Sequence, residues 1–184
     1  MSARTVLSSD DIDRSIKRIA HEILESQFSN NSGKPKDLVI LGIPTRGVQL
    51  AERIAQIICA KNPGLIVEEI QGCIDITMYR DDLNRQPTRN VLGTQIPKQG
   101  IDNKVVVLVD DVLFSGRTVR AALDALNDYG RPKAVQLAVL VDRGHRELPI
   151  KADFVGKNLP TSKEERINVQ LSEIDDLNSV EISS

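Results

Sequence analysis

The sequence predicts an α/β fold built on a doubly wound, mostly parallel β-sheet. Short apolar runs of the kind that form buried strands alternate along the chain with segments of helical periodicity. One of these strands leads through two aspartates and a loop of small polar residues into a helix, and open α/β sheets bind ligands at such places. Because 184 residues is the length of one domain, we expect residues 1–184 to form a single unit.

The first helix is predicted from the spacing of its isoleucines. Ser8 and Ser9 are suited to cap a helix, and four isoleucines then recur from Ile12 to Ile23 at steps of four, three and four. After the turn-rich segment 29–36, the apolar run 38–43 has the length and composition of a buried strand. A helix followed by a buried strand begins the α/β pattern.

The alternation continues through the rest of the chain. Gly130 and Pro132 end one of the helices, and the polar segment 142–162, which contains glycine and proline, is expected to be irregular. The predicted elements are a helix at 48–60, a strand-like run at 65–76, a strand at 105–109, a helix at 118–129, a strand at 134–141 and a last strand near 167–171.

Composition argues against several classes of protein. With 24 Lys+Arg against 26 Asp+Glu, the net charge of -2 gives no global positive field for nucleic acid or an anionic membrane. Cys59 and Cys73 lack the close spacing of a metal or redox pair, which favours a reducing compartment. No apolar run has the length of a signal peptide core or a membrane span, so we expect a cytoplasmic protein without a membrane partner. Aromatic residues, at 3%, are too few for a dedicated single-strand binder.

The clearest functional signal runs from Val105 to Thr118. An apolar strand ends in Asp110 and Asp111, and the chain then passes through the small polar loop 115–118 into a helix. Gly116 lets backbone approach a ligand closely, hydroxyls donate hydrogen bonds, and the helix N-terminus offers unpaired amides to an anion. This combination predicts a phosphate site.

The two aspartates extend that prediction. Carboxylates repel a phosphate, but they accept hydrogen bonds from sugar hydroxyls or hold a divalent cation through water. Phosphate and diol together indicate a ribose phosphate. The alternative is that Asp110 and Asp111 simply end a strand and that Ser115 caps a helix; the ordered succession of strand, acids, loop and helix argues against it. A nucleotide P-loop is disfavoured because its Gly-x4-Gly-Lys-Ser/Thr spacing is absent.

A second anion site is predicted at the turn Pro44 to Gly47. It follows the first central strand and therefore lies at the same edge of the sheet, where a glycine-flanked Arg46 can meet an anion with backbone and guanidinium. We expect Thr45 and Arg46 to face pyrophosphate. An ordinary strand-to-helix connection is the alternative.

The charged segment 75–103 is much longer than the usual connection of ~4 to 6 residues. Loops of that length inside a compact domain are usually functional or disordered. We expect Tyr79, Arg80 and Arg85 to belong to a flexible basic lid that closes on a diphosphate and stabilises the charge of the leaving group. Because loops naturally carry charge, a solvated surface is the alternative for each residue.

Several segments together resemble one family. The run VVLVDDVLFSGRT looks like the phosphoribosyl pyrophosphate (PRPP) signature of type I phosphoribosyltransferases, and GIPTRG, DITMYRDDL, LVDRGHRELPI and DFVGKNLPTS resemble the bifunctional pyrimidine operon regulator / uracil phosphoribosyltransferase family. The resemblance spans residues 5 to 175. It implies a type I phosphoribosyltransferase fold with a small hood, conversion of uracil and PRPP to UMP and pyrophosphate with Mg²⁺, and assembly as a homodimer or homotetramer.

The resemblance also implies roles for the residues that match. Arg80, Asp110 and Asp111 are expected to be catalytic, with Mg²⁺ held by the two aspartates through water, and Arg143 and Val169 are expected near the base. No histidine is placed to act as a general base. The residues expected to bind PRPP are Thr45, Arg46, Val106, Asp110, Asp111, Val112, Leu113, Phe114, Ser115, Gly116, Arg117 and Thr118.

The base is the harder choice. Purine-specific relatives carry an Asp where this chain has Phe114 and a Lys where it has Asp142, and both departures weaken a purine interpretation. For Asp142 and Arg143, a surface ion pair at a strand end is the structural alternative. A purine-specific salvage enzyme is the catalytic alternative.

Regulation of messenger RNA is the second function that the resemblance implies, because family members bind the leader of pyrimidine operon mRNA when UMP or UTP is present. The residues expected to form a basic RNA-binding patch are Arg14, Lys17, Arg18, His21, His145, Arg146 and Lys151. The alternatives are a solvated helix face with a charged loop, and an enzyme that serves salvage only.

Overall fold

The computed structural model describes residues 3–29, 37–81 and 93–184. Its centre is a parallel sheet with the strand order β3-β2-β4-β5-β6, which confirms the predicted fold class. The strands are β2 (Leu38–Gly42), β3 (Gln71–Cys73), β4 (Val105–Leu113), β5 (Ala134–Asp142) and β6 (Phe154–Asn158).

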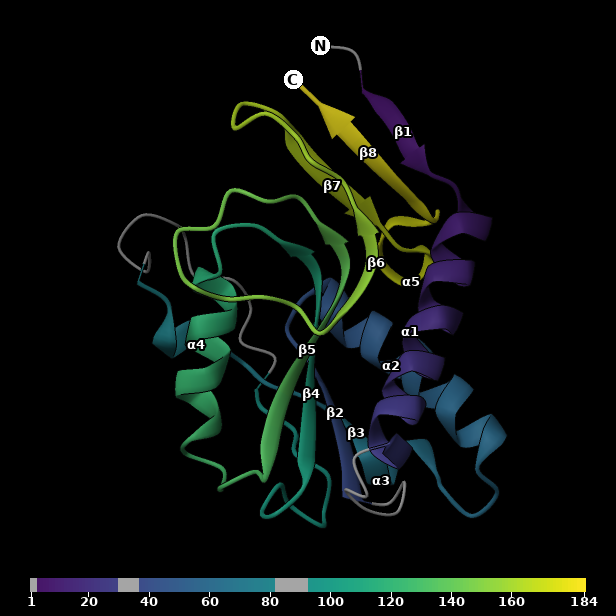
Figure 1. Cartoon of the computed structure of the whole chain (residues 1–184), viewed down its shortest axis with the longest axis vertical. Coiled ribbons are helices and arrows are strands. Elements are labelled where there is room, and N and C mark those ends of the chain that lie inside the picture. The colour runs from purple at the N-terminus through teal and green to yellow at the C-terminus, as the bar shows by residue number, and fades with distance from the viewer. Residues whose placement is uncertain (1–2, 30–36, 82–92) are drawn as a thin grey trace.

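Helices cover both faces of this sheet (Figure 1). One face is covered by α1 (Ser9–Ser29) and α2 (Arg46–Lys61), and the other by α4 (Arg117–Leu126). Ser8 caps α1 as predicted: its hydroxyl accepts a hydrogen bond from the Asp11 amide and donates one to the Asp11 carboxylate. The short helical turns are α3 (Val67–Ile70), η2 (Thr77–Tyr79) and α5 (Ser172–Asp175).

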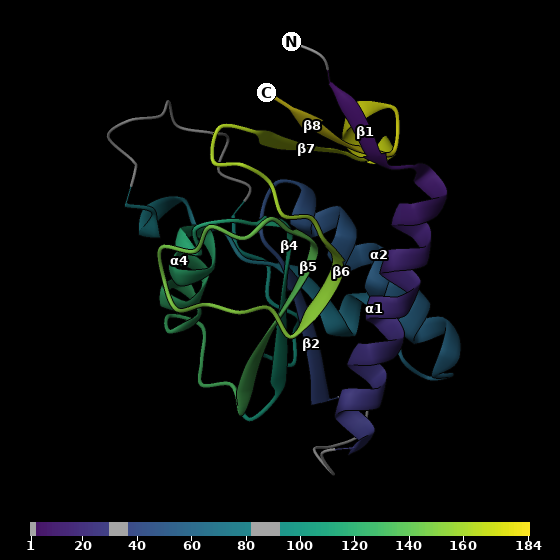
Figure 2. The same cartoon turned by 45° about the horizontal axis from the view of Figure 1, so that its top comes forward.

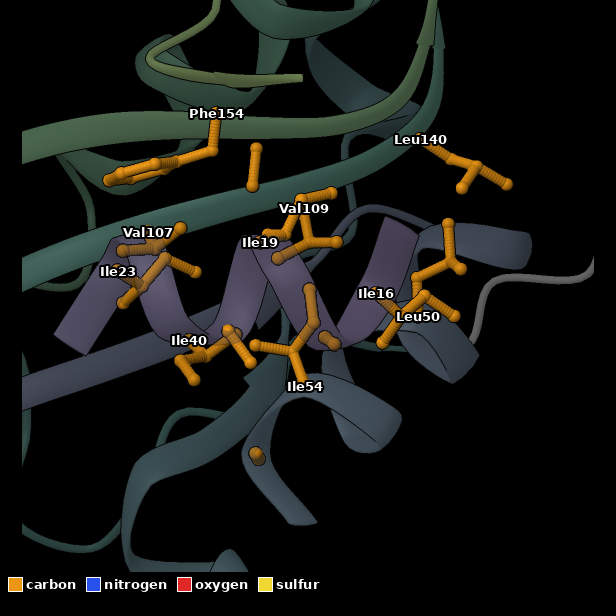
Figure 3. Close-up of a cluster of buried hydrophobic side chains, with 14 of the residues drawn as sticks. Ile16, Ile19, Ile23, Ile40, Leu50, Ile54, Val107, Val109, Leu140 and Phe154 are labelled. Carbon is orange, nitrogen blue, oxygen red and sulfur yellow. The ribbon is translucent and has the colours of Figure 1, made fainter. Parts of the chain in front are cut away.

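The larger core lies between α1, α2 and the sheet. Ile16, Ile19 and Ile23 of α1 point into it, at 2%, 2% and 0% exposed, and Figure 3 shows them packed against Ile54 of α2 and Val107 of β4. The predicted isoleucine stripe is therefore the buried face of α1. Burial of this face fixes α1 and α2 against the strands whose ends carry the site.

A second, antiparallel sheet forms the hood. Its order is β1-β8-β7, from β1 (Arg4–Leu7), β8 (Ser179–Ser183) and β7 (Arg166–Gln170). Figures 1 and 2 show it above the central sheet, with the start of β1 and the end of β8 both at the top of the hood. The hood strands thus bring the two ends of the chain together.

Four details differ from the sequence prediction. The run 65–76 contains only the short strand β3, because α3 precedes it. The segment 142–162 contains β6, and the hood strands β1 and β8 were not predicted. Finally, β4 ends at Leu113 and not at Val109, so it includes both aspartates of the motif.

Candidate functional site

Asp110 and Asp111 lie within β4 near its carboxyl end, where they are held by strand pairing. Asp110 is in register with Val139 of β5, and the pairing continues to Leu113 opposite Asp142. The side chains of a strand alternate between its two faces, so neighbouring residues of the motif have different surroundings. Asp110 is 7% exposed, whereas Asp111 is more exposed.

Burial excludes side-chain contacts with PRPP at two of the predicted positions. Val106 and Leu113 are 0% and 1% exposed and belong to the core beneath α4. Their side chains therefore stabilise the sheet and do not contact a ligand. Val112 is half-buried and packs against the opposite core.

The predicted pyrophosphate turn lies directly beside the aspartates. A Cβ on Gly47 would stand 2.4 Å from the Val109 carbonyl oxygen and 3.3 Å from the Asp110 Cα, so only glycine allows the start of α2 to approach β4 so closely. The Ile43 amide also donates a hydrogen bond of 2.8 Å to the Val109 carbonyl. The structure thus brings the two sequence motifs together.

Asp110 has unusual electrostatics for a carboxyl group. Burial, and then the neighbouring Asp111 carboxylate, raise its pKa well above the usual range, while the positive charge of Arg80 acts in the opposite direction. Each aspartate also orients the next peptide: Asp110 Oδ1 accepts from the Asp111 amide at 2.9 Å, and Asp111 Oδ1 accepts from the Val112 amide at 2.8 Å. A buried carboxyl group beside a more exposed one can bind a cation or accept a hydrogen bond from a hydroxyl.

The phosphate loop borders a cavity of about 160 Å³. Gly116 has φ +93°, a left-handed conformation that favours glycine, and it precedes the first residue of α4. Gly116 has no side chain to bond the first amides of the helix, and the Arg117 amide donates instead to Ser115 Oγ at 3.4 Å. The helix N-terminus faces the loop. The residues that line the cavity are Arg80, Asp81, Ser115, Arg117 and Thr118.

Two carboxylates hold the Arg117 side chain beside this cavity. Its Nη1 donates to Asp81 and its Nε donates to Glu147 at 2.8 Å, and these partners raise the Arg117 pKa. Glu147 comes from the segment after β5, so Arg117 joins the root of the long loop to that segment. Because all three side chains are about half exposed, the pairs are open to exchange with a bound anion.

The lid prediction is only partly covered by the described residues. Tyr79 ends the η2 turn and its hydroxyl donates to Asp128 near the end of α4. Arg80 follows and lines the cavity. Arg85 lies outside the described residues.

Arg46 has a partner that the sequence did not indicate. Its Nη2 and Nε donate to the Asp175 carboxylate of α5 at 2.7 and 3.1 Å, and this contact lowers the Asp175 pKa. The guanidinium is thereby joined to the hood. Thr45, the N-cap of α2, is exposed and provides no side-chain cap. The Val48 amide donates to the Thr45 carbonyl at 3.3 Å, so the Arg46 and Gly47 amides are the ones that an anion would meet.

On the base side, an exposed aromatic ring meets a buried cation. The Phe114 ring is 38% exposed, and the Arg143 guanidinium lies 4.3 Å from its centroid. His145 approaches the same ring edge-on, with 6.3 Å between centroids. Val169 is 2% exposed, so its side chain lies in the core and only its backbone remains as a base contact.

The predicted basic patch is not one cluster. Arg14, Lys17 and His21 are exposed on α1, whereas Lys151 borders a groove beside α4 on the other face of the sheet. The α1 residues and Lys151 therefore lie on opposite faces of the central sheet. This corrects the prediction that the fold brings them together within one chain.

Four members of the patch bind within the protein, and one of them, Arg14, pairs with Asp11 on the exposed face of α1 at 2.7 Å. Arg18 donates to the carbonyls of Val155 and Gly156 at 2.9 and 2.6 Å and so ties α1 to β6. Arg146 donates to the Asp142 carboxylate and to the carbonyls of Phe114 and Ile150. His145 bonds to the Thr161 carbonyl. Asp142 is thus a partner of Arg146, and the alternative of a surface ion pair between Asp142 and Arg143 is not what the structure has.

Magnesium is compatible with the pair Asp110 and Asp111. Among the described residues, no group of three or more His, Cys, Asp or Glu side chains could enclose a metal ion. Mg²⁺ usually keeps several waters and binds through one or two carboxylates and the phosphates of its substrate. Two adjacent aspartates at a phosphate loop meet that requirement.

A model of the phosphoribosyl transferase domain matches residues 5–173, which include every part of the site described above except Asp175. The chain belongs to the phosphoribosyltransferase family. A hypoxanthine phosphoribosyltransferase of Trypanosoma cruzi has the same fold, with a TM-score of 0.70 over 97% of this chain and 95% of that chain at 16% identity. At this identity, the likeness concerns the fold alone.

Relatives within this phosphoribosyltransferase family are much closer in sequence. "Bifunctional protein PyrR" of Streptomyces coelicolor is 60% identical over 97% of this chain and 88% of its own length. The protein of the same name from Mycolicibacterium paratuberculosis is 55% identical over 98% of this chain and 93% of its own length. The resemblance inferred from the motifs is therefore confirmed over nearly the whole chain. No helix in the described ranges has the length and apolarity to cross a membrane.

The sequence did not reveal three partners in the site: Asp175, Glu147 and Thr161. Each joins the site from a segment distant in the chain from the residue it binds. Asp175 and Glu147 are carboxylates in charged surface segments, so composition alone gives no signal for them. The acidic partners of Arg46 and Arg117 can therefore be identified only once the fold is known.

Proposed function

We propose that the chain is a uracil phosphoribosyltransferase, which forms UMP and pyrophosphate from uracil and PRPP, and that it also regulates pyrimidine genes. The observation that carries the enzymatic part is the joining of Asp110 and Asp111 to the Arg46 turn through Gly47. This proximity supports a diol-binding acid pair between two anion sites, as a ribose carrying a 5-phosphate and a diphosphate requires. The relatives at 52–60% identity share the name PyrR.

Each part of the site has a task in this proposal. The 5-phosphate binds in the cavity beside Ser115 and Thr118, and Asp111 accepts hydrogen bonds from the ribose hydroxyls. Departure of pyrophosphate leaves positive charge on C1, which uracil N1 captures. Arg80 stabilises the negative charge that develops on the leaving group, and Arg46 contributes to the same binding site. The protein mainly positions its substrates and stabilises charge.

Mg²⁺ is the proposed cofactor, bound through water by Asp110 and Asp111. When bound, it neutralises charge on the diphosphate. The buried Asp110 supports this role, because an unpaired carboxylate at that depth is costly and a cation would compensate its charge. Titration of activity with Mg²⁺, with EDTA as the control, tests the cofactor.

The base is proposed to be a pyrimidine. The Arg143 guanidinium over Phe114 offers donors to a carbonyl oxygen of the base. The purine alternative is not favoured, because the relatives of known hypoxanthine activity share only 16–20% identity with this chain and the PyrR proteins share far more.

A base panel tests the enzymatic proposal. The purified protein is incubated with PRPP, Mg²⁺ and, in separate reactions, uracil, cytosine, hypoxanthine and guanine, and the nucleotides are separated by chromatography. We expect UMP from uracil. Activity on hypoxanthine or guanine without activity on uracil would overturn the proposal.

RNA regulation is the second proposed activity, with pyrimidine operon leader mRNA as the partner and UMP or UTP as the effector. Support comes from the bifunctional name of the relatives and from the exposed Arg14, Lys17 and His21 on α1. Filter binding of leader RNA with and without UMP, at two salt concentrations, tests it. Equal affinity for leader RNA and an unrelated RNA of the same length would contradict the regulatory role.

A cytoplasmic location and assembly as a homodimer or homotetramer complete the proposal. Its substrates and nascent transcripts are found in the cytoplasm. Size-exclusion chromatography with light scattering determines the assembly; a monomer at micromolar concentration would contradict that part.

A further inference from the structure

The Phe114 ring is held between two basic side chains that come from one segment. Arg143 covers a face of the ring at 4.3 Å and His145 meets its edge at an interplanar angle of 69°. Both follow β5 directly, and the Arg143 amide donates to the Leu113 carbonyl at the end of β4. This hydrogen bond fixes the main chain of Arg143, but its long side chain needs further contacts to keep one orientation.

Those contacts all come from the loop between β6 and β7. Arg143 Nη2 donates to the carbonyls of Ser162 and Glu165 at 2.9 and 2.7 Å, and its Nε donates to Thr161 Oγ1 at 3.1 Å. The loop is itself braced, because the Ser162 amide donates to the Glu165 carboxylate at 2.7 Å. Of the three acceptors, only the Thr161 hydroxyl belongs to a side chain.

Burial makes these contacts important for Arg143. The residue is 7% exposed, and burial lowers its pKa below the usual value. A buried guanidinium needs a partner for each donor, since an unpaired one carries the cost of its lost hydration. Among the described residues, Nε bonds only to Thr161, and no hydrogen bond is made by Nη1.

Thr161 also holds the second residue at the ring. Its carbonyl oxygen is bonded by His145 Nε2, so in the neutral imidazole the proton lies on Nε2 and Nδ1 is an acceptor. Thr161 thus binds Arg143 with its side chain and His145 with its main chain. Thr161 therefore contacts both basic residues that lie against the Phe114 ring.

We infer that Thr161 is a positioning residue for base recognition. By accepting from Nε, the Thr161 hydroxyl keeps the guanidinium over Phe114 and leaves the Nη1 donors to a carbonyl oxygen of the base. A fixed cationic donor selects an oxo-pyrimidine and disfavours an amino group at the same place, as in cytosine. The inference rests on the proposed uracil phosphoribosyltransferase activity and adds to it a residue that does not touch the base.

Two substitutions separate the hydroxyl from the rest of the side chain. Thr161→Val keeps the branched shape and removes the acceptor, and Thr161→Ser keeps the hydroxyl; Thr5→Val, in the exposed strand β1, is the control. For Thr161→Val we expect KM for uracil to rise about tenfold, equivalent to about 1.4 kcal/mol, while KM for PRPP stays within about twofold. Thr161→Ser should restore most of the uracil affinity.

Binding of UMP and of ribose 5-phosphate by calorimetry gives a readout that a merely structural role would not produce. Thr161→Val should weaken UMP binding and leave ribose 5-phosphate unchanged. The inference is overturned if KM for uracil is unchanged, if Thr161→Ser is as impaired as Thr161→Val, or if both substrates are affected equally. Should Thr161→Val not fold by circular dichroism, Thr161→Ala with the same serine comparison replaces it.

The uracil assay of the wild-type protein distinguishes failure of the proposed function from failure of the inference about Thr161. If this protein forms no UMP from uracil, the proposed function fails. If it does so and Thr161→Val has wild-type kinetics, only the inference about Thr161 fails.

Discussion

At the scale of single residues, the adjacent aspartates of β4 show how one strand gives two like side chains different surroundings. Asp110 faces the interior at 7% exposed, with a raised pKa, while Asp111 is more accessible and bonds the next amide. The strand period of two dictates this difference. We therefore propose that Asp111 contacts the ribose and that Asp110 acts through its charge on the bound cation.

Asp111→Asn tests that assignment. Asparagine keeps the shape but loses the charge that strengthens hydrogen bonds from the ribose hydroxyls, and such bonds are worth about 1.5 to 3 kcal/mol. Turnover should fall by about ten- to a hundredfold in the uracil assay. Asp124→Asn, on the exposed side of α4, is the matched control and should retain full activity. Wild-type rates for Asp111→Asn would refute the ribose contact.

The sequence identified most residues of the candidate site but not how deeply each side chain is buried. The PRPP signature is contiguous, so Val106 and Leu113 were included with the true edge residues although both are buried. The basic patch failed for a similar reason: charge along the chain predicts solvent contact, yet Arg18 and Arg146 bind backbone carbonyls. Long basic side chains can reach partners that no local pattern encodes.

At the scale of elements, helices were easier to predict than short strands. The periodicity of α1 and the apolar runs of β2, β4 and β5 are strong signals, and the structure confirms them. β6 was missed because its Gly156 is unfavourable in a strand. A Cβ at Gly156 would stand 2.5 Å from the Leu140 carbonyl oxygen, so the same glycine is what lets β6 lie against β5.

The hood depends on long-range pairing that the sequence does not display. β1 and β8 come from opposite ends of the chain and contain few residues. Leu7, Val169 and Val180 of the hood pack into the larger core. α2 adds polar contacts to the hood through Arg46 and Arg53, which lie seven residues apart and therefore on one face of the helix. Arg53 donates to Glu173 at 2.8 Å and to Asn178 at 2.8 Å, beside the Arg46 contact with Asp175.

At the scale of the whole molecule, one of these ion pairs, Arg46 with Asp175, joins the hood to the candidate site. Arg46 belongs to the predicted pyrophosphate turn, and its partner Asp175 lies on the segment between β7 and β8. Figure 2 shows the hood lying across the end of the central sheet at which the site is built. The Arg46 guanidinium thus takes part both in the contact with the hood and in the predicted binding of pyrophosphate.

Acid should weaken this connection, and the sign follows from the direction of the pKa shifts. The hydrogen bonds from Arg46 and Arg53 lower the pKa values of Asp175 and Glu173. A carboxyl with a lowered folded-state pKa stabilises the fold above its unfolded value, near 4, and this contribution is lost as pH falls through the lower folded value. The two pairs should therefore contribute at neutral pH and fade below about pH 4.

Glu173→Gln/Asp175→Asn measures that contribution. At pH 7 the double variant should unfold in urea with a free energy about 2 kcal/mol below that of the wild type, because two arginines lose charged partners in a half-buried contact. As the pH is lowered toward 3, the difference should shrink, since the wild-type carboxylates become protonated. Asp176→Asn removes one negative charge from the same segment, where the described residues show no ion pair for it, and should change little at any pH. A difference between double variant and wild type that is constant with pH would mean that packing, and not charge, holds the hood to the core.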